Sequence, residues 1–263
     1  MKTLVSLLTD FGLSDSFVGE LKATIFSICP EAEVIDITHD VERFNIRMGA
    51  FLLASSTPFF PVGSVHVAVV DPGVGSERRP IAVETSRSVY VGPDNGLLIP
   101  AAAREGIQHV YELTNRSLLR NTISSTFHGR DIFAPVAAHI ACGMQPNEVG
   151  EELMDYERLS FREPEFDRGG ITCEAVHIDH FGNIVTNISL LNMDKLNSIP
   201  KVMITIHGKR IRARLVKTYS DLDKRELGIL SGSHGFLEIA TRENNVSRRL
   251  KAKPGDTIRV SFN

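Results

Sequence analysis

One short segment combines residue types that acid–base chemistry needs with a backbone able to approach a ligand closely. An apolar run, Val67–Val70, ends at Asp71, and a loop containing Pro and two glycines leads to Arg78 and Arg79. An unbroken apolar run is typical of a strand buried on both faces, and ligands bind beyond the carboxyl ends of such strands. We therefore expect Asp71 and a guanidinium at a ligand site. The alternative is a tight turn with a capping Asp and a solvated Arg pair.

Three further polar residues stand where an expected element begins or ends. Asp10 follows the first expected strand, and a carboxylate there can accept both hydroxyls of a ribose. Asp15 lies near a helix start, where its alternative role is to cap that helix. His128 precedes an expected helix, whose dipole would lower the pKa of the imidazole and favour its neutral form. Its alternative is a purely structural histidine.

Other polar clusters carry weaker signals. The stretch 92–96 presents Asp94 and Asn95 to a ligand or only makes a turn, and we favour the turn. The stretch 177–183 has a spacing similar to that of metal ligands, but residue 180 would point away from residues 177 and 179 on a strand. The pattern favours a metal site only if the strand ends before residue 180. The stretch 231–235 is a small-residue loop suited to close backbone approach.

The first half of the chain alternates strand and helix patterns, which predicts an α/β domain with a mostly parallel sheet. The expected strands are 3–8, 34–37, a strand ending at Asp71, 81–84 and 89–91. The expected helices begin at Asp15 or Ser16, span 45–54 and span 130–142. Phe17, Leu21, Ile25 and Ile28 would share one face of the first helix.

The second half is rich in strands, which predicts an all-β, barrel-like domain. The expected strands are 171–179, 184–188, 202–206, 210–215, 236–240 and 257–262. An acidic, polar stretch with Pro and Gly residues between 143 and 170 predicts a linker. We expect domains at 1–165 and 170–263.

Composition narrows the function classes. The 263 residues are 42% hydrophobic and 23% charged, as in an ordinary soluble protein. A net charge of -3 gives no general attraction to nucleic acid or to an anionic membrane. Three widely spaced cysteines (Cys29, Cys142 and Cys173) argue against a disulfide framework and a zinc site. With no signal-like or membrane-length apolar segment, we expect a cytoplasmic protein.

Taken in order, these segments resemble the S-adenosylmethionine hydrolases, also called S-adenosylmethionine hydroxide adenosyltransferases, and their fluorinating and chlorinating relatives. The resemblance covers nearly the whole chain. It rests on the segments TDFGLSDSFVGELKATI, VAVVDPGVGSERR, GPDNGLL, STFHGRDIFAP, IDHFGNIVTNI and SGSHGFLEIA.

The resemblance implies a homotrimer, with substrate between the first domain of one subunit and the second domain of its neighbour. It implies that Asp10 holds the ribose diol and Phe44 walls the ribose. It implies that Asp15 and Asp179 take the methionine ammonium. In the same way, Ser233 would lie near the methionine carboxylate, Asn183 would contact adenine and Tyr219 would stack on its ring. S-adenosylmethionine would be the substrate, adenosine and methionine the products, and no cofactor or metal would be needed.

The hydrolase members carry an Asp, Arg, His triad, which Asp71, Arg78 and His128 supply here, with Arg79 a second candidate for the arginine. The halogenating relatives have tyrosines at the positions of Asp71 and His128. Two stretches depart from the family pattern. His234, expected with Ser233 among the substrate-binding residues near the methionine carboxylate, stands where many relatives have a small residue or Arg. Arg242–Asn245 differs from the usual Asn, Gln, Gly, Asn run.

The expected reaction is attack of water or hydroxide on the 5′ carbon of the adenosyl group. Three alternatives stay open. A metal-dependent phosphohydrolase would gather metal ligands around a divalent ion with Arg78 on phosphate, the candidates being Asp10, Asp71, Asn95, His128 and Asp131. A sensor would bind S-adenosylmethionine or adenosine without turnover. A halogenase is suggested by Gly129, which resembles the chlorinating relatives, but Asp71 would repel a halide.

Overall fold

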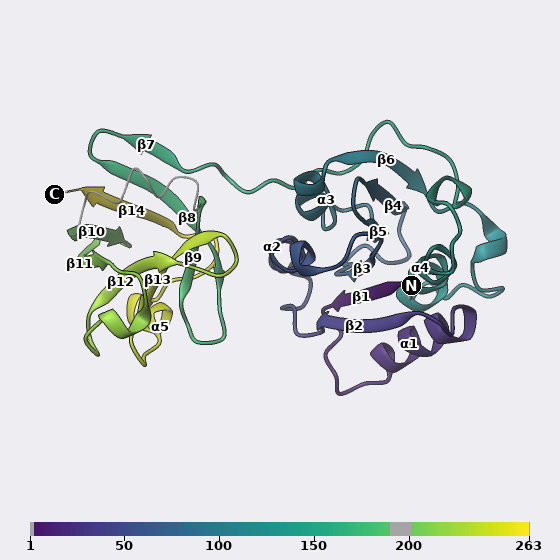
Figure 1. Ribbon diagram of the computed structural model, residues 1–263, viewed down its shortest axis with the longest axis horizontal. Coiled ribbons are helices and arrows are strands. Elements are labelled where there is room, and N and C mark those ends of the chain that lie inside the picture. The colour runs from purple at the N-terminus through teal and green to yellow at the C-terminus, as the bar shows by residue number, and fades with distance from the viewer. Residues whose placement is uncertain (1–2, 190–200, 263) are drawn as a thin grey trace. The chain divides into compact units, whose positions relative to one another are not determined.

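The computed structural model describes residues 3–189 and 201–262, and the chain divides into two compact units, 1–160 and 161–263 (Figure 1). The outermost residues of the expected domains, 1 and 263, lie outside the described part. The first unit ends at Ser160, whereas the expected first domain ran to residue 165. The difference arises because Glu165 begins β7, which pairs with β8 of the second unit.

The first unit is an α/β domain built on a mixed sheet. Its strands are β1 (Leu4–Thr9), β2 (Glu33–Thr38), β3 (Val65–Val69), β4 (Pro80–Thr85), β5 (Val89–Pro93) and β6 (Ile107–Glu112). Within the described residues they lie in the order β2-β1-β3-β5-β4-β6. The pairings from β2 to β5 are parallel, and β4 pairs antiparallel with both β5 and β6. The expectation of an α/β domain is confirmed, with β4 as the strand that makes the sheet mixed.

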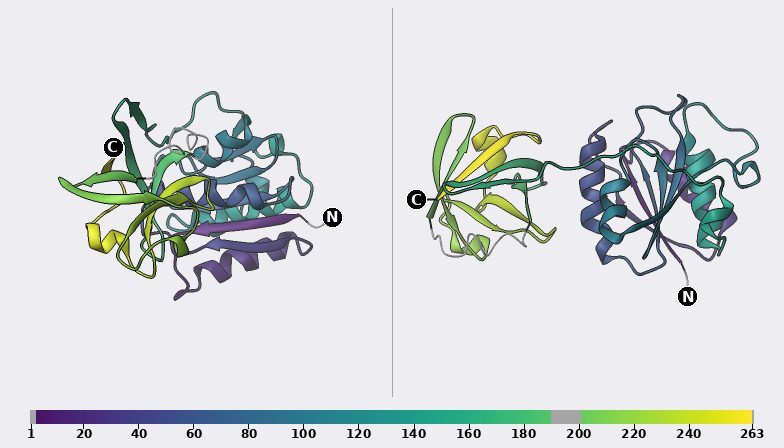
Figure 2. Two further views of the ribbon diagram at one scale, coloured as in Figure 1. Left: turned by 60° about the vertical axis from the view of Figure 1, so that its left-hand side comes forward. Right: turned by 90° about the horizontal axis from the view of Figure 1, so that it is seen from above.

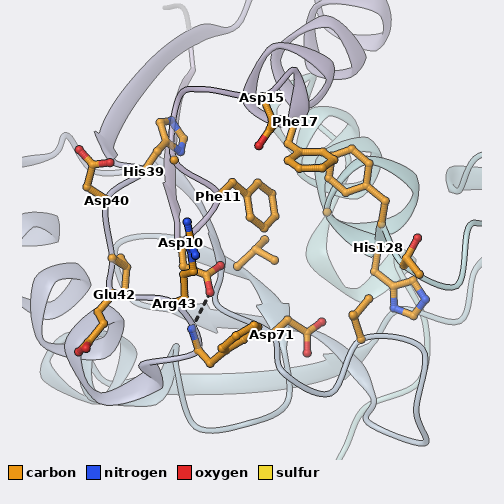
Figure 3. A pocket seen from close by; sticks show the side chains of 18 of the residues that line it. Asp10, Phe11, Asp15, Phe17, His39, Asp40, Glu42, Arg43, Asp71 and His128 are labelled. Atoms are coloured by element: carbon orange, nitrogen blue, oxygen red, sulfur yellow. Dashed lines mark hydrogen bonds between the residues drawn. The ribbon is translucent and has the colours of Figure 1, made fainter.

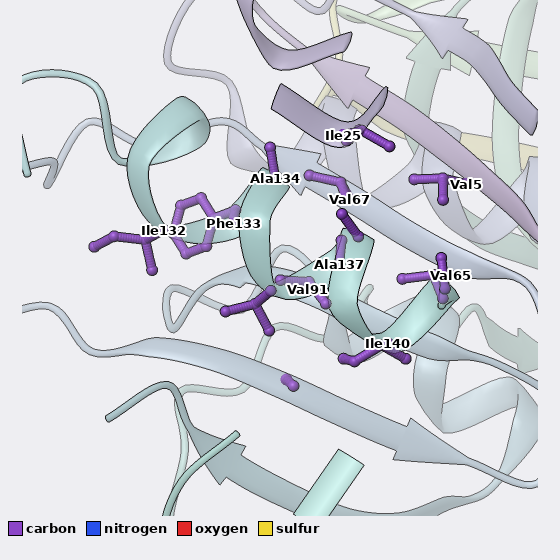
Figure 4. Packing of buried hydrophobic residues seen from close by; sticks show 14 of the residues in the cluster. Val5, Ile25, Val65, Val67, Val91, Ile132, Phe133, Ala134, Ala137 and Ile140 are labelled. Carbon is purple, nitrogen blue, oxygen red and sulfur yellow. The ribbon is translucent and has the colours of Figure 1, made fainter. Parts of the chain in front are cut away.

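Helices cover both faces of this sheet (Figure 2). They are α1 (Phe17–Ile28), α2 (Ile46–Ser56), α3 (Ile99–Glu105) and α4 (Ala134–Ala141). Figure 4 shows Val65 and Val67 of β3 packed with Ile25 of α1 and with Ala137 of α4. Gly49 of α2 lies against Val70 on the other face. Every residue of β3 is buried, which explains its unbroken apolar run.

The starts of the first and last expected helices differ from the simplest reading of the sequence. Ser16 stands at the N-cap of α1, but its side chain makes no capping bond; its hydroxyl donates instead to Glu20. At α2 the side chain of Asn45 accepts from the backbone N–H of Met48, so this cap has the expected chemistry. The expected helix 130–142 begins as a π-helical turn, Gly129–Phe133, and continues as α4.

The second unit is a β-barrel. Its strands are β7 (Glu165–Asp167), β8 (Gly170–Ile178), β9 (Ile184–Ser189), β10 (Lys201–Ile206), β11 (Lys209–Leu215), β12 (Leu227–Ser231), β13 (Phe236–Thr241) and β14 (Thr257–Phe262), with the short helix α5 (Val246–Leu250). In the part of the chain that is described, pairing of β14 with both β10 and β8 closes a ring of seven strands, and β7 adds to β8. The expectation of a barrel-like second domain is confirmed.

The expectation that the cysteines form no disulfide is wrong. Cys29 and Cys142 form a disulfide with Cα atoms 5.7 Å apart, and Cys173 is free and buried. Cys29 follows the last residue of α1 and Cys142 follows the last residue of α4, so the bond joins the ends of two helices on one face of the sheet. A separation of 113 residues gives no local motif, which is why spacing failed to indicate the pair.

No helix among the described residues is long and apolar enough to cross a membrane.

The disulfide predicts a measurable contribution to stability. Closing so long a loop restricts the unfolded chain, so reduction is expected to lower the free energy of unfolding by about 2–4 kcal/mol. The melting temperature should fall by roughly 5–15 °C, measured by circular dichroism with and without reductant. Cys142→Ser should melt at the reduced temperature under both conditions. Three titratable thiols in the unreduced, denatured protein would contradict the bond.

Candidate active site

A cavity of about 620 Å³ opens in the first unit, beyond the carboxyl ends of β1 and β3 (Figure 3). Asp10 follows β1, and Asp71 follows β3 after Val70. These strands are parallel neighbours, so their carboxyl ends meet at one edge of the sheet. The lining includes the polar residues Asp10, Ser14, Asp15, His39, Asp40, Glu42, Arg43, Asp71, Thr126 and His128.

Arg78 joins the acid and the imidazole. Its Nε lies 3.2 Å from Asp71 Oδ1 and its Nη2 lies 2.5 Å from Oδ2, which makes a two-point ion pair. The same Nη2 donates to Nδ1 of His128 at 2.9 Å. The side chains of Arg78 and Asp71 are only 7% and 5% exposed, and the guanidinium lies over the ring of Phe133. The three residues expected from sequence therefore form one hydrogen-bonded group.

Glycine allows the two loops of this group to meet. Gly75 has φ +77°, and a Cβ there would lie 2.4 Å from the carbonyl oxygen of Ser125. Only a residue without a side chain fits that approach. The loop after β3 thus packs against the loop that carries His128.

His128 is held in its neutral form with a defined tautomer. Burial and the charge of Arg78 lower the pKa of His128, against smaller opposing effects of Asp71 and Asp131. Because Nδ1 accepts from Arg78, the ring hydrogen of the neutral imidazole lies on Nε2. The expected direction of the shift is right, but its main causes are burial and Arg78 rather than a helix dipole. His128 precedes a single π-helical turn.

Arg79 has other partners. Its guanidinium bonds Asp94 Oδ2 from Nε at 3.0 Å and from Nη2 at 2.8 Å, and its Nη1 pairs with Asp155 at 3.1 Å. Asp94 also accepts the backbone N–H of Glu157. Arg79 therefore fastens the stretch 155–157 to the turn after β5, and Asp94 serves this contact rather than a ligand. The geometry leaves Arg78 as the arginine of the group.

Asp10 and Phe44 are brought together at the cavity. The backbone N–H of Phe44 donates to Asp10 Oδ2 at 2.8 Å. Phe44 has φ 65°, a conformation rare for a bulky residue, and the residue is 68% exposed. One carboxylate oxygen of Asp10, Oδ2, thus accepts a hydrogen bond from the protein backbone.

His39 is a positioning group that sequence reasoning missed. Its Nδ1 lies 2.8 Å from Thr9 Oγ1, and its Nε2 lies 3.1 Å from Asp36. Its carbonyl accepts the N–H of Gly12, so it holds both ends of the loop that carries Asp10. The only sequence signal was a polar residue just after the strand β2.

Asp15 is exposed at the cavity, beside aromatic rings that were also missed. Phe11, Phe17 and Phe127 contact one another edge-to-face, with ring centroids 5.2–6.0 Å apart. Arg130 lies over the ring of Phe127. Such apolar walls with few polar groups are typical of small-molecule sites.

The second unit has its own cavity of about 520 Å³, lined by Phe181, Asn183, Tyr219, Thr241, Glu243, Asn244 and Asn245. Asn183 bonds Asp179 twice, from its backbone N–H at 2.8 Å and from its amide at 2.9 Å. Asp179, Asn183 and Tyr219 thus occupy one region of the barrel. Ser233 and His234 lie in the turn between β12 and β13 and do not line this cavity.

Two of the five ligands expected for a phosphohydrolase, Asn95 and Asp131, lie outside the cavity. The amide of Asn95 donates to the carbonyl of Val70, and Asp131 is fully buried against Arg130 and the N–H of Ser124. Neither lines the cavity that holds Asp10, Asp71 and His128. Within residues 3–189 and 201–262, no three His, Cys, Asp or Glu side chains are grouped to hold a metal ion.

Comparison with known proteins places this geometry in a family. Residues 5–150 match the model of the SAM hydroxide adenosyltransferase N-terminal domain, and residues 173–259 match that of its C-terminal domain. The chain therefore belongs to the SAM hydroxide adenosyltransferase family.

Individual relatives extend over the full length. An (R)-S-adenosyl-L-methionine hydrolase of Salinispora arenicola is 38% identical, covering 98% of this chain and 97% of its own. A more distant fluorinase of an Actinoplanes species is 26% identical, covering 98% of this chain and 97% of its own. A crystal structure of a conserved protein from Thermotoga maritima superposes with a TM-score of 0.94 at 40% identity, covering 97% of this chain and 99% of that one.

The contacts of His128 predict its titration. NMR of the C2 proton should give a pKa below the ordinary value of 6.5, because burial and Arg78 both oppose the imidazolium. In Arg78→Gln the pKa should rise, since the opposing cation is gone while Asp71 remains. Arg79→Gln is the matched control and should leave the titration unchanged. A pKa that falls or stays constant in Arg78→Gln would contradict the assigned contact.

Proposed function

We propose that this chain hydrolyses S-adenosyl-L-methionine to adenosine and L-methionine, with Asp71, Arg78 and His128 holding the attacking water. The supporting observation is the hydrogen-bonded group of these three residues at a nucleoside-sized cavity. A relative that is 38% identical over nearly the full length carries the name (R)-S-adenosyl-L-methionine hydrolase. S-adenosylmethionine is consumed as substrate, and the proposal requires no cofactor.

The difficult part of this reaction is activation of the water nucleophile, not departure of the leaving group. Oxygen of water forms a bond to the 5′ carbon while the bond from that carbon to sulfur breaks, and its electron pair goes to sulfur. The leaving group is neutral methionine thioether, so no general acid is needed. Positive charge on sulfur disappears during the step, so strong stabilisation of the sulfonium would slow it.

Asp71, Arg78 and His128 would have different roles toward the water. His128 carries its ring hydrogen on Nε2 and acts as a hydrogen-bond donor to the water, because Arg78 occupies Nδ1. Asp71 is the acceptor that takes the proton lost by the water, and Arg78 fixes the orientation of this carboxylate. Alignment of the water with the carbon–sulfur axis adds to the effect of the base.

Substrate contacts follow the family resemblance. Asp10 would accept from the ribose hydroxyls, Phe44 would wall the ribose, and Asp15 would bind the methionine ammonium. These residues line the first cavity.

The remaining contacts are in the second unit. Asp179 would join Asp15 at the ammonium, Asn183 would contact adenine, Tyr219 would stack on it, and Ser233 would approach the methionine carboxylate. We propose a homotrimer in which a neighbouring subunit supplies this second set.

Water is favoured over halide as the nucleophile. A halide entering the cavity would approach the Asp71 carboxylate, and like charges repel strongly where water is excluded. The two-point pair with Arg78 already uses the cation nearest to it. Hydrolysis therefore suits this electrostatic arrangement.

The test is product analysis by chromatography after incubation with S-adenosylmethionine. Adenosine and methionine should appear in equal amounts. Asp71→Asn should lower kcat by about 10²- to 10⁴-fold, the range of a general base, with little change in KM. Arg79→Gln is the control, because Arg79 contacts Asp94 and Asp155 instead.

Folded, ligand-free protein that binds S-adenosylmethionine without forming adenosine would contradict the proposal and indicate a sensor. Equal loss of binding and turnover in Asp71→Asn would place Asp71 in binding rather than in proton transfer.

A further inference from the structure

A carboxylate is buried on the outer face of the barrel, outside its hydrophobic interior. Glu238 lies in β13 between Leu237 and Ile239, which belong to the barrel core. Side chains alternate along a strand, so Glu238 points to the opposite face. Its side chain is only 4% exposed. Burying a charge is costly unless it is paired, so its partners indicate what it holds.

One partner comes from a segment folded over this face. Val216 and Leu222 pack with Leu230 and Ala240 in a small cluster outside the barrel core. Between them lies the turn Tyr219–Asp221, and the Tyr219 hydroxyl donates to Oε1 of Glu238. The Tyr219 residue remains 45% exposed and lines the second cavity. Glu238 thus fixes the hydroxyl end of a ring whose body lies at that cavity.

The other partner is His234, in the turn between β12 and β13. Its Nε2 lies 3.2 Å from Glu238 Oε2, and its Nδ1 accepts the backbone N–H of Phe236 at 3.3 Å. The ring hydrogen therefore lies on Nε2 and is donated to Glu238. The ring packs on Gly232, where a Cβ would lie 2.2 Å from its Cε1. His234 thus connects Glu238 to the turn that carries Ser233.

The pKa shifts of Glu238 and Tyr219 are consistent with their hydrogen bonds. Burial opposes ionisation of Glu238, but the hydrogen bonds from His234 and Tyr219 outweigh it and lower the pKa of Glu238. Burial and the nearby carboxylate raise the pKa of Tyr219, so the phenol keeps its proton and donates. A carboxylate with two donors is a rigid junction, since each oxygen has a fixed partner.

We propose that Glu238 is a positioning residue for substrate binding, because it fixes Tyr219 and, through His234, the turn carrying Ser233. The proposal rests on the function proposed above, in which Tyr219 stacks on adenine and Ser233 approaches the methionine carboxylate. His234 therefore acts as a brace within the protein at the position where relatives have a small residue or Arg.

The test is steady-state kinetics of Glu238→Gln with S-adenosylmethionine. The amide keeps the shape but is uncharged and has one acceptor oxygen instead of two, so the charge-assisted bonds from Tyr219 and His234 cannot both be kept. KM should rise by about 10- to 100-fold, as expected for losing a hydrogen bond to a charged group. The kcat should stay within about threefold, because both contacts are remote from the reacting carbon.

Matched variants separate positioning from general destabilisation. Glu226→Gln removes another carboxylate of the same barrel, paired with Arg214 at 2.9 Å, and should leave KM unchanged. Tyr219→Phe keeps the ring but removes its hydroxyl. The double variant Tyr219→Phe/Glu238→Gln should lose less than the product of the single effects, since both act on one bond. Thermal unfolding identifies folded variants.

An unchanged KM in folded Glu238→Gln, or an equal rise in Glu226→Gln, would overturn the proposal. So would a fall in kcat alone. If the wild-type protein forms no adenosine, the proposed reaction fails, and calorimetric titration with adenosine then tests Glu238 by itself. Weaker adenosine binding by Glu238→Gln than by wild type supports the positioning role, and equal binding overturns it.

Discussion

The ion pair between Arg78 and Asp71 is the constraint on which the rest of the first unit depends. It places a carboxylate that is 5% exposed beside the end of a buried strand, where an unpaired charge would be too costly to keep. Removing one partner of such a pair typically costs about 3–5 kcal/mol. Because the same guanidinium also bonds His128, one side chain sets both the orientation of the acid and the tautomer of the imidazole.

The surrounding fold serves to hold this group at the sheet edge. Parallel pairing of β1 with β3 brings Asp10 and Asp71 to one edge, and Gly75 lets the loop after β3 approach the loop before the π-helical turn. His39 and Thr9 hold the loop that carries Asp10. In the second unit, the closed barrel carries Glu238 on its outer face. There the carboxylate accepts from Tyr219 and His234 and holds them in place.

Much of this arrangement could be predicted from sequence where the signal is local. The unbroken apolar run before Asp71 identified a buried strand, whereas the grouping of Asp71, Arg78 and His128 came from the resemblance to the hydrolase family. Arg78 was preferred over Arg79 from the family's spacing, and the coordinates add that Arg79 pairs instead with Asp94 and Asp155. The disulfide was missed because its cysteines are far apart in the chain. Glu238 was missed because an acidic residue in a strand normally indicates a solvated face.

The central claim is that the group around Arg78 directs a water molecule to the 5′ carbon of the adenosyl group. The most direct measurement is turnover of S-adenosylmethionine in H₂¹⁸O, with mass spectrometry of the products. The account predicts one ¹⁸O atom in the 5′ hydroxyl of adenosine and none in methionine. Adenosine without the label, or products cleaved at another carbon–sulfur bond, would contradict it.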